Sequence, residues 1–258
     1  MSKTGYQKVV DFNTCFGSHV ATEYDKHLYF SHPNIVNLKY GLVDEEVKEL
    51  DEAYMENDIV EIIDALCDIK YVLYGMAAAF GINSDVEFKK YLRYTCDKSN
   101  TIDNSDFVMV KNLNNDINYD VKNYINNSKN TEFKKKTHKI MSNIILINAN
   151  LKKAKNNAKF DIMLQELNVL LYHVNLMGIT IGVNLDDAFN IVHSSNMSKV
   201  CPSEDLAKET VAWYLDNDDR YKTPDYRESD YGWVVFNKDT GKILKSIKYT
   251  PADFSTLL

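Results

Sequence analysis

Apolar residues recur every three or four positions through two long stretches, at about residues 35–54 and 58–80. This is the period of an amphipathic helix and not of a strand. Shorter stretches at 6–16 and 85–96 have the same spacing. A turn at about 54–58 would fold the two long helices back on each other as an antiparallel pair. The first part of the chain is therefore predicted to be helical, apart from an irregular segment at 17–36.

The helical pattern returns between Ile140 and His193 and resembles the first one. Without any gap, residues of the two stretches correspond at an offset of 101 positions. The pairs Gly81/Gly182, Asn83/Asn184, Asp85/Asp186 and Phe88/Phe189 form a register that two unrelated amphipathic helices would rarely share. We interpret the two stretches as degenerate copies of one ancestral unit.

The remaining segments are more polar or more strand-like. We expect a helix at 203–215, a polar turn-like stretch at 216–230, and a hairpin between the strand-like runs at 233–236 and 242–247. The predicted fold is all-α, an antiparallel helical bundle of two degenerate repeats with a small C-terminal β-hairpin appendage. Its expected segments are 1–97 (first repeat), 98–139 (polar insertion or linker), 140–200 (second repeat) and 201–258 (C-terminal helix and hairpin).

Acidic residues cluster on the two long helices of the first repeat. The cluster consists of Glu45, Glu46, Glu49, Glu61, Asp64 and Asp68. Residues three apart share a helical face, and an antiparallel pair would bring these faces together. Such acids are often a solvated surface, but the second helix is otherwise apolar, and buried carboxylates need a compensating cation. Glu46, Glu49, Glu61, Asp64 and Asp68 are therefore candidate ligands for Mg²⁺ or Mn²⁺.

The second repeat has none of these acids. Its equivalent positions are Leu146, Ile147, Asn150, Ile162, Gln165 and Val169. If the acids only made a surface soluble, both repeats would carry similar charge there. The difference predicts one metal site per chain, with the second repeat as its packing partner.

Composition narrows the possible functions. The 258-residue chain has a net charge of −7 and a pI near 5.4, which argues against a general nucleic-acid binder. Its longest apolar run, at 71–82, is too short to span a bilayer, so no membrane association is expected. The four cysteines show no C-x-x-C spacing. We expect reduced thiols and a cytoplasmic location.

The motif E-E-x-x-E at 45–49, followed by E-x-x-D at 61–64, resembles the all-α NTP pyrophosphohydrolases. These include the MazG-like proteins, the dimeric dUTPases and the phosphoribosyl-ATP pyrophosphohydrolases. The resemblance implies Mg²⁺-dependent cleavage of an NTP or dNTP to the monophosphate and pyrophosphate, in a homodimer. It also implies that either Glu45 or Glu49 is the general base. Two later motifs would contact the phosphates, through Asn196 and Lys199 (196–199) and through Lys242 and Lys245 (241–245).

Several alternatives stay open at this point. Phosphoribosyl-ATP and dUTP are both possible substrates, and a non-catalytic nucleotide-binding helical scaffold is a further alternative. A di-iron bundle normally needs Glu-x-x-His pairs, and none of the six histidines follows a glutamate by three positions. Because the repeat occurs twice within the chain, a monomer could also suffice.

Overall fold

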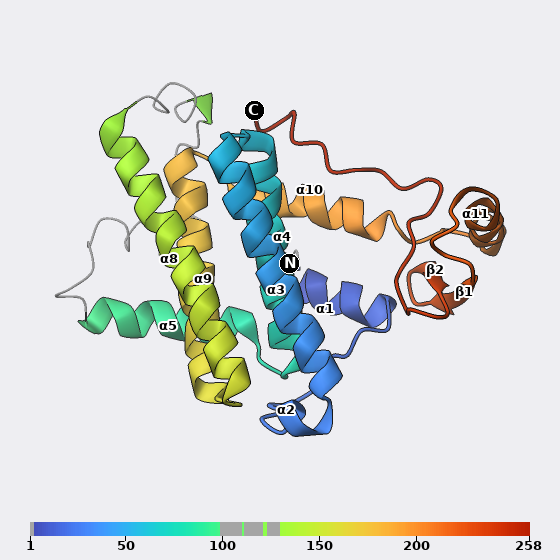
Figure 1. Ribbon diagram of the computed structural model, residues 1–258, viewed down its shortest axis with the longest axis horizontal. Helices are drawn as coiled ribbons and strands as arrows, with labels where there is room; N and C mark the ends of the chain where they lie inside the picture. Colours follow the sequence, from blue (N-terminus) through green and yellow to red (C-terminus); the bar gives the residue numbers. More distant parts are fainter. Residues whose placement is uncertain (1–2, 99–109, 111–120, 123–129) are drawn as a thin grey trace.

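The computed structural model describes residues 3–98, 110, 121–122 and 130–258. Its helices are α1 (Gly5–Cys15), α2 (Leu28–Ser31), α3 (Pro33–Glu56), α4 (Ile59–Ala79), α5 (Ser84–Lys98), α8 (Thr131–Asn156), α9 (Phe160–Ile181), α10 (Leu185–Met197) and α11 (Glu204–Asn217). The strands are β1 (Pro224–Ser229) and β2 (Gly232–Asn237). A mostly helical chain with a small C-terminal hairpin confirms the predicted fold class (Figure 1).

Two helical hairpins form the body of the molecule. The first is α3 with α4 and the second is α8 with α9, and α3 packs against α8 (Figure 1). The turn between α3 and α4 lies where the sequence predicted it. Asn57 adopts the left-handed conformation (φ 55°) and Asp58 caps α4 by accepting hydrogen bonds from the backbone N–H groups of Val60 and Glu61. Such a cap satisfies donors that a helix start otherwise leaves unpaired.

The elements of the two repeats correspond at the offset seen in the sequence. Helix α4 begins at Ile59 and α9 at Phe160, while α5 begins at Ser84 and α10 at Leu185, a difference of 101 in each case. The bend between α4 and α5 is 106° and that between α9 and α10 is 108°. Matching bounds and matching bends are what the internal repeat predicts.

The main hydrophobic core lies between the two hairpins. Leu50 and Leu66 of the first repeat and their counterparts Leu151 and Leu167 have no exposed surface. Burial of one leucine side chain contributes about 2 kcal/mol. Helices α4 and α9 supply much of this core, which explains why they are the most apolar stretches of the chain.

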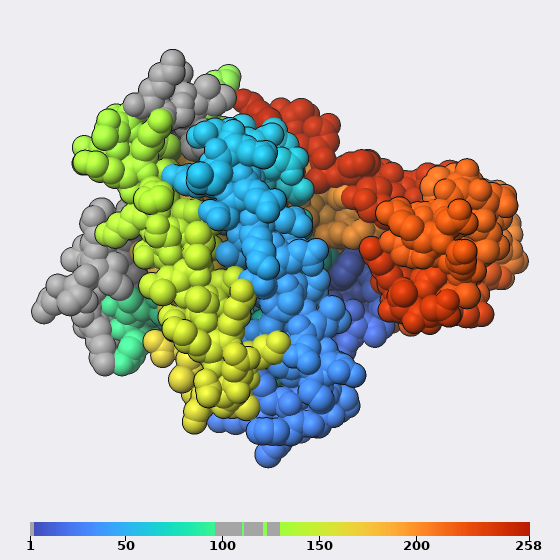
Figure 2. Space-filling view, viewed as in Figure 1, coloured from blue at the N-terminus to red at the C-terminus, as the bar shows by residue number. Residues whose placement is uncertain are grey.

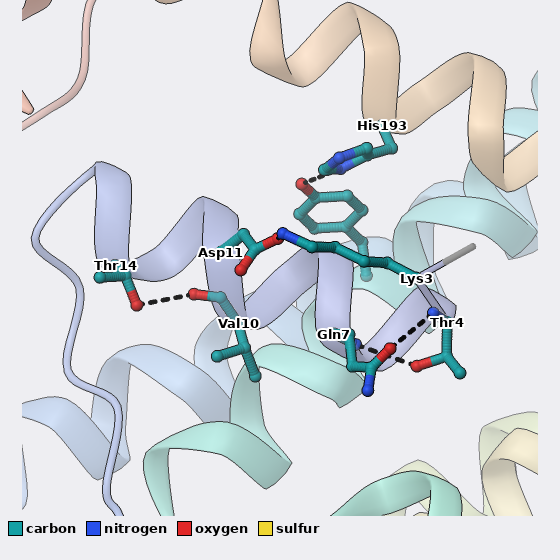
Figure 3. Close-up of polar contacts among 8 residues, drawn as sticks. Lys3, Thr4, Gln7, Val10, Asp11, Thr14 and His193 are labelled. Atoms are coloured by element: carbon teal, nitrogen blue, oxygen red, sulfur yellow. Dashed lines mark hydrogen bonds and ion pairs between the residues drawn. The ribbon is translucent and has the colours of Figure 1, made fainter. Parts of the chain in front are cut away.

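Helix α1 covers one side of α4 and also contacts α10. Its start carries a reciprocal capping box, in which the Thr4 hydroxyl accepts from the Gln7 backbone and the Gln7 side chain accepts from the Thr4 backbone (Figure 3). The chain after α1 passes over the C-terminal end of α4. There Gly81 lies so close to the Glu23 carbonyl that a Cβ would stand 1.8 Å from its oxygen, which only glycine permits.

The C-terminal residues form a small lobe beside the helical body (Figure 2). Its core comprises Cys201, Leu206, Ala207, Tyr214, Val235 and Leu244. Strand β2 pairs with β1 in an antiparallel ladder from Pro224↔Asn237 to Ser229↔Gly232. The expected pairing of 233–236 with 242–247 is present only as a short antiparallel bridge, Phe236↔Ile243. The turn expected throughout 216–230 was wrong for residues 224–229, which form β1.

The reason lies in where the backbone donors of 242–247 are used. The expected reversal at Asn237–Gly241 is present, and Leu244 donates to the Val235 carbonyl at 2.9 Å. Beyond that point, the N–H of Lys245 donates to the Tyr214 hydroxyl and that of Ile247 to the Thr210 hydroxyl, both on α11. The segment therefore leaves β2 for α11 after this bridge, and the polar stretch 224–229 forms the ladder on the other edge of β2.

Helix α8 starts at Thr131, whereas the expected insertion extended to residue 139. The Asn130 side chain caps the helix, and Thr137 is buried, so a polar sequence still forms a packed helical turn here. Most of the predicted insertion lies outside the described residues.

Within the described residues, no single helix is both long and apolar enough to cross a membrane. The bent pairs α4–α5 and α9–α10 reach the required length and apolar composition only when the two helices of each pair are counted together. Cys15, Cys67 and Cys201 are buried free thiols. The side chain of Cys96 lies outside the described set.

Candidate functional site

The six acids predicted from the sequence line the seam between α3 and α4. Glu45, Glu46 and Glu49 come from α3, and Glu61, Asp64 and Asp68 come from α4. The neighbouring core positions Val47, Leu50 and Ile63 are fully or almost fully buried. The acids therefore lie at the edge of the core: Glu46, Asp64 and Asp68 are half-buried, and Glu45, Glu49 and Glu61 are exposed.

The pKa of Glu46 shows that acids of both helices share one electrostatic environment. Burial, together with the negative charges of Asp68, Glu49, Glu45 and Asp64, raises the pKa of Glu46 to about 8. A carboxyl ordinarily loses its proton near pH 4. The field of the neighbouring acids therefore opposes the charged form of Glu46 at neutral pH.

The pKa values of two acids on α4, Asp64 and Asp68, are raised in the same way. Burial and the charge of Asp64 raise the pKa of Asp68 to about 7, although Lys199 acts in the opposite direction. Burial and the charges of Glu61 and Glu49 likewise raise the pKa of Asp64. Among the described residues, none of the six acids forms an ion pair or a side-chain hydrogen bond. The site thus gathers negative charge without a protein cation bonded to it.

The donor set fits a hard divalent cation in its chemistry. Every candidate ligand is a carboxylate oxygen, the type that Mg²⁺ and Mn²⁺ prefer. Within the described residues, no three His, Cys, Asp or Glu side chains are placed so that they could ligate one ion as they stand. Uncompensated like charges favour side-chain conformations that keep the carboxylates apart. Ligation by Glu46, Glu49, Glu61, Asp64 and Asp68 therefore stays a prediction.

Lys199 faces the acids from the end of α10. Its Nζ donates to the Asn196 side-chain carbonyl at 2.6 Å and lies 5.9 Å from the centroid of the Phe12 ring. Burial, together with the positive charge of Lys245, lowers the pKa of Lys199, while the charge of Asp68 raises it. The structure thus brings Lys199, with Asn196 bonded to it, towards Asp68, and Lys245 lies close enough for its charge to act on Lys199.

Ser198, directly after α10, holds the C-terminal segment around Thr250 against the end of that helix. The Ser198 hydroxyl donates to the Ser195 carbonyl at 2.7 Å and accepts from the Thr250 backbone N–H at 2.9 Å. This tie places Lys245 near the end of α10. Lys242 lies elsewhere, with its Nζ 5.5 Å from the centroid of the Tyr221 ring and its charge acting on Asp218. Of the four predicted phosphate contacts, Lys199 is the one whose charge acts on an acid of the seam, and Asn196 is bonded to it.

Two functional candidates escaped the sequence analysis. The Tyr71 hydroxyl lies 3.1 Å from Nδ1 of His193 (Figure 3). Burial and the charge of Asp68 raise the pKa of this tyrosine. On α3, Lys39 has only 6% of its surface exposed, and burial lowers its pKa. A lysine seven residues before Glu46 falls on the same helical face, and that spacing was the available signal.

The second repeat presents a different surface at the equivalent seam. Leu146 and Ile162 are 58% and 46% exposed, and Asn150 donates to Glu166 at 3.4 Å. Asp44, beside the acid cluster, contacts this repeat by accepting from Asn148 and pairing with Lys152. The acidic seam of the first repeat therefore has no counterpart in the second.

Comparison with known proteins agrees with this distribution. The family described as phosphoribosyl-ATP pyrophosphohydrolase matches residues 12–92, the part of the chain that carries all six acids. The chain is also 31% identical over 272 aligned residues to the uncharacterized protein L479 of Acanthamoeba polyphaga mimivirus, with 99% of this chain and 96% of that protein covered. No solved structure matches the chain significantly.

The match to L479 extends over both repeats and the C-terminal lobe, so the two proteins share one family. The match over 12–92 places the acidic seam within the segment that the family model covers, and it supports a hydrolase function of the nucleotide pyrophosphohydrolase type. Through this segment the chain belongs to the all-α NTP pyrophosphohydrolase superfamily that its motifs resemble.

Proposed function

We propose that the protein is a Mg²⁺-dependent pyrophosphohydrolase that converts an NTP or dNTP to the monophosphate and pyrophosphate. The observation that carries this proposal is the acidic seam, six carboxylates on two facing helices without a bonded protein cation among the described residues. A cation-free seam of this kind suits a substrate that arrives with divalent ions on its phosphates.

In this proposal, Glu46, Glu49, Glu61 and Asp64 hold the ions, and Asp68 either joins them or orients a ligand. Bound Mg²⁺ would neutralise phosphate charge and lower the pKa of an attacking water. Glu45 or Glu49, both exposed at the seam, accepts the proton of that water. Mn²⁺ could replace Mg²⁺ because both prefer oxygen ligands.

Lys199 supplies positive charge that acts on Asp68 of the seam, and Asn196 holds its Nζ in place. Lys245 adds a second positive charge nearby. These groups would orient the triphosphate so that the leaving pyrophosphate meets a lysine. Since the acids and Lys199 belong to one chain, a complete site needs no second subunit.

The proposal includes an ancient duplication in which the second repeat lost the acids and kept the packing role. Matching element bounds and bends support this history. A duplication followed by loss of the acids in the second repeat gives one metal site per chain.

Pyrophosphate release from a panel of nucleotides, with Mg²⁺ or with EDTA, tests the proposal. Glu49→Ala and Asp64→Ala should each abolish Mg²⁺-dependent release, a loss of at least about 100-fold. Glu56→Ala, at the exposed end of α3, is the matched acidic control and should keep full activity. Undiminished release by either seam variant would contradict the assignment. Nucleotide binding without any release would favour the scaffold alternative.

Phosphoribosyl-ATP is a second candidate substrate, because the matching family is described by its hydrolysis. The panel should therefore include phosphoribosyl-ATP, dUTP, dCTP and the common NTPs. Release from phosphoribosyl-ATP alone would replace the general NTP or dNTP proposal with that specific one.

A further inference from the structure

A cavity of about 460 Å³ lies away from the acidic seam. Residues of α1, α4, α5, α9 and α10 line it. Its α4 residue Lys70 is two positions after Asp68, and two helical positions correspond to a rotation of about 200°. The cavity therefore faces nearly the opposite side of α4 from the acids. We call it the repeat-junction cavity, because Asp85 and Phe88 of the first repeat line it together with their counterparts Asp186 and Phe189.

The repeat-junction cavity has an excess of positive charge in a protein whose net charge is −7. Four lysines and two aspartates line it: Lys3, Lys8, Lys70, Lys89, Asp85 and Asp186. Lys70 is buried and pairs with Asp186 at 3.0 Å, and Lys3 pairs with Asp11 (Figure 3). The exposed Lys89 forms no ion pair within the described part of the chain, which leaves its charge available to a ligand.

Three helices also begin at this cavity, namely α1 at Gly5, α5 at Ser84 and α10 at Leu185. A helix start carries a partial positive charge of about half an elementary unit and points N–H groups outward. The capping side chains of Thr4, Asn83 and Asn184 bond to later N–H groups of each first turn. The helix starts therefore add to the lysine charge.

An unpaired buried hydroxyl provides an independent sign of a missing ligand. Ser84 lines the cavity with 1% of its surface exposed, and its Oγ has no hydrogen-bond partner among the described residues. Buried hydroxyl groups almost always have a partner, because an unsatisfied one costs about 1–3 kcal/mol. An acceptor atom of a bound molecule would satisfy it.

We propose that the repeat-junction cavity binds a small anion of the phosphate class, such as inorganic phosphate or pyrophosphate. Its oxygens accept from the Ser84 hydroxyl, from Lys89 and Lys8, and from backbone N–H groups at the helix starts. Such an anion contacts both repeats at once. Its binding therefore stabilises the junction between them, and this holds whether or not the acidic seam hydrolyses nucleotides.

Binding of phosphate and of pyrophosphate to the full-length protein tests the proposal, by calorimetry and by thermal unfolding. EDTA is present so that no divalent ion can bring the anion to the acidic seam, and chloride matches the ionic strength. Wild-type protein should bind one anion per chain and unfold at a higher temperature with it. Ser84→Ala and Lys89→Ala should each weaken binding by about tenfold. Without anion, Ser84→Ala should leave the unfolding temperature unchanged or raise it, because it removes only an unsatisfied hydroxyl.

Two controls separate this cavity from other sources of binding. Lys139→Ala removes an exposed lysine of α8 and should bind the anion as the wild type does. Glu49→Gln alters the acidic seam and should also keep full anion binding. Absence of saturable binding to the wild type would overturn the proposal. Equal weakening by Lys139→Ala and Lys89→Ala would overturn it too, because it would indicate attraction to surface lysines in general.

Discussion

Burial and neighbouring acids disfavour the charged forms of Glu46 and Asp68 and raise their pKa values to about 8 and about 7. A protein selected only for stability would have apolar residues there, and Ile147 and Val169 occupy the equivalent places of the second repeat. Retention of costly carboxylates in one copy is typical of a site whose electrostatics serve binding.

Two buried lysines on facing helices should respond in opposite ways to replacement by methionine. Lys39 is buried without an acceptor among the described residues, and Lys70 is buried against Asp186. We predict that Lys39→Met raises the free energy of unfolding by about 1–2 kcal/mol, because a desolvated charge is removed. Lys70→Met should lower it by about 1 kcal/mol, because it breaks a hydrogen-bonded ion pair whose other member, Asp186, is exposed.

Urea unfolding of the two variants at pH 7 checks this prediction. Loss of stability in Lys39→Met as large as in Lys70→Met would mean that Lys39 has an acceptor, such as a buried water, that the protein depends on.

His193 should make the free energy of unfolding decrease as the pH falls into the mildly acidic range. Burial and the charge of Lys8 lower its pKa to about 4, whereas an unfolded histidine has a pKa of about 6.5. Between these values the unfolded chain binds a proton that the folded chain does not. The contribution of neutral His193 is therefore fully present above about pH 6.5 and is lost as the pH falls towards 4.

We predict that the wild type loses roughly 1–2 kcal/mol more stability than His193→Gln between pH 7 and pH 4.5. Chemical unfolding at both pH values measures the difference. His138→Gln, which replaces an exposed histidine of α8, should behave as the wild type does. Parallel pH profiles of His193→Gln and the wild type would contradict the prediction.

At the scale of elements, α3 is held against the second repeat through Asp44. Burial disfavours the charge of this carboxylate, but hydrogen bonds from Lys152, Lys48 and Asn148 outweigh it and lower the pKa of Asp44 to about 2. Asp44 thus links α3 to α8 one residue before the acidic motif begins.

We predict that Asp44→Asn lowers the free energy of unfolding by about 1 kcal/mol, the range of a partly exposed ion pair. A double-mutant cycle with Lys152→Met should give a coupling energy of similar size, and Glu56→Gln serves as the α3 control. A coupling energy of zero would show that the pair contributes nothing to the packing of α3 on α8.

The elements also show what the sequence could predict. Helical periodicity located α1, α3, α4 and α5, because burial on one helical face leaves a regular pattern, and the offset of 101 between the repeats agrees with the bounds of α9 and α10. The pairing of β1 with β2 was missed, because residues 224–229 are polar and have no apolar strand pattern, while hydrogen bonds of Lys245 and Ile247 to α11 shorten the expected pairing of 242–247. The proximity of Lys199 to Asp68 was suggested by family resemblance alone, because no local pattern encodes an interaction across 131 positions.

At the scale of the whole molecule, the two repeats place within one chain a pair of hairpins that could otherwise come from two subunits. The homodimer implied by family resemblance stays a prediction. Light scattering after size-exclusion chromatography should give twice the chain mass of 29.7 kDa. A mass equal to one chain at all concentrations would show that the internal repeat replaces the partner.

Lys199 and the acids belong to a single polypeptide, and the tie between Ser198 and Thr250 fixes the C-terminal segment beside Lys199. Sites shared between subunits fall apart on dilution, since their assembly follows mass action. A site assembled within one chain does not. Specific activity should therefore stay constant as the enzyme is diluted from micromolar to picomolar, and a cell holding a few copies of the protein would lose none of its catalytic capacity per molecule.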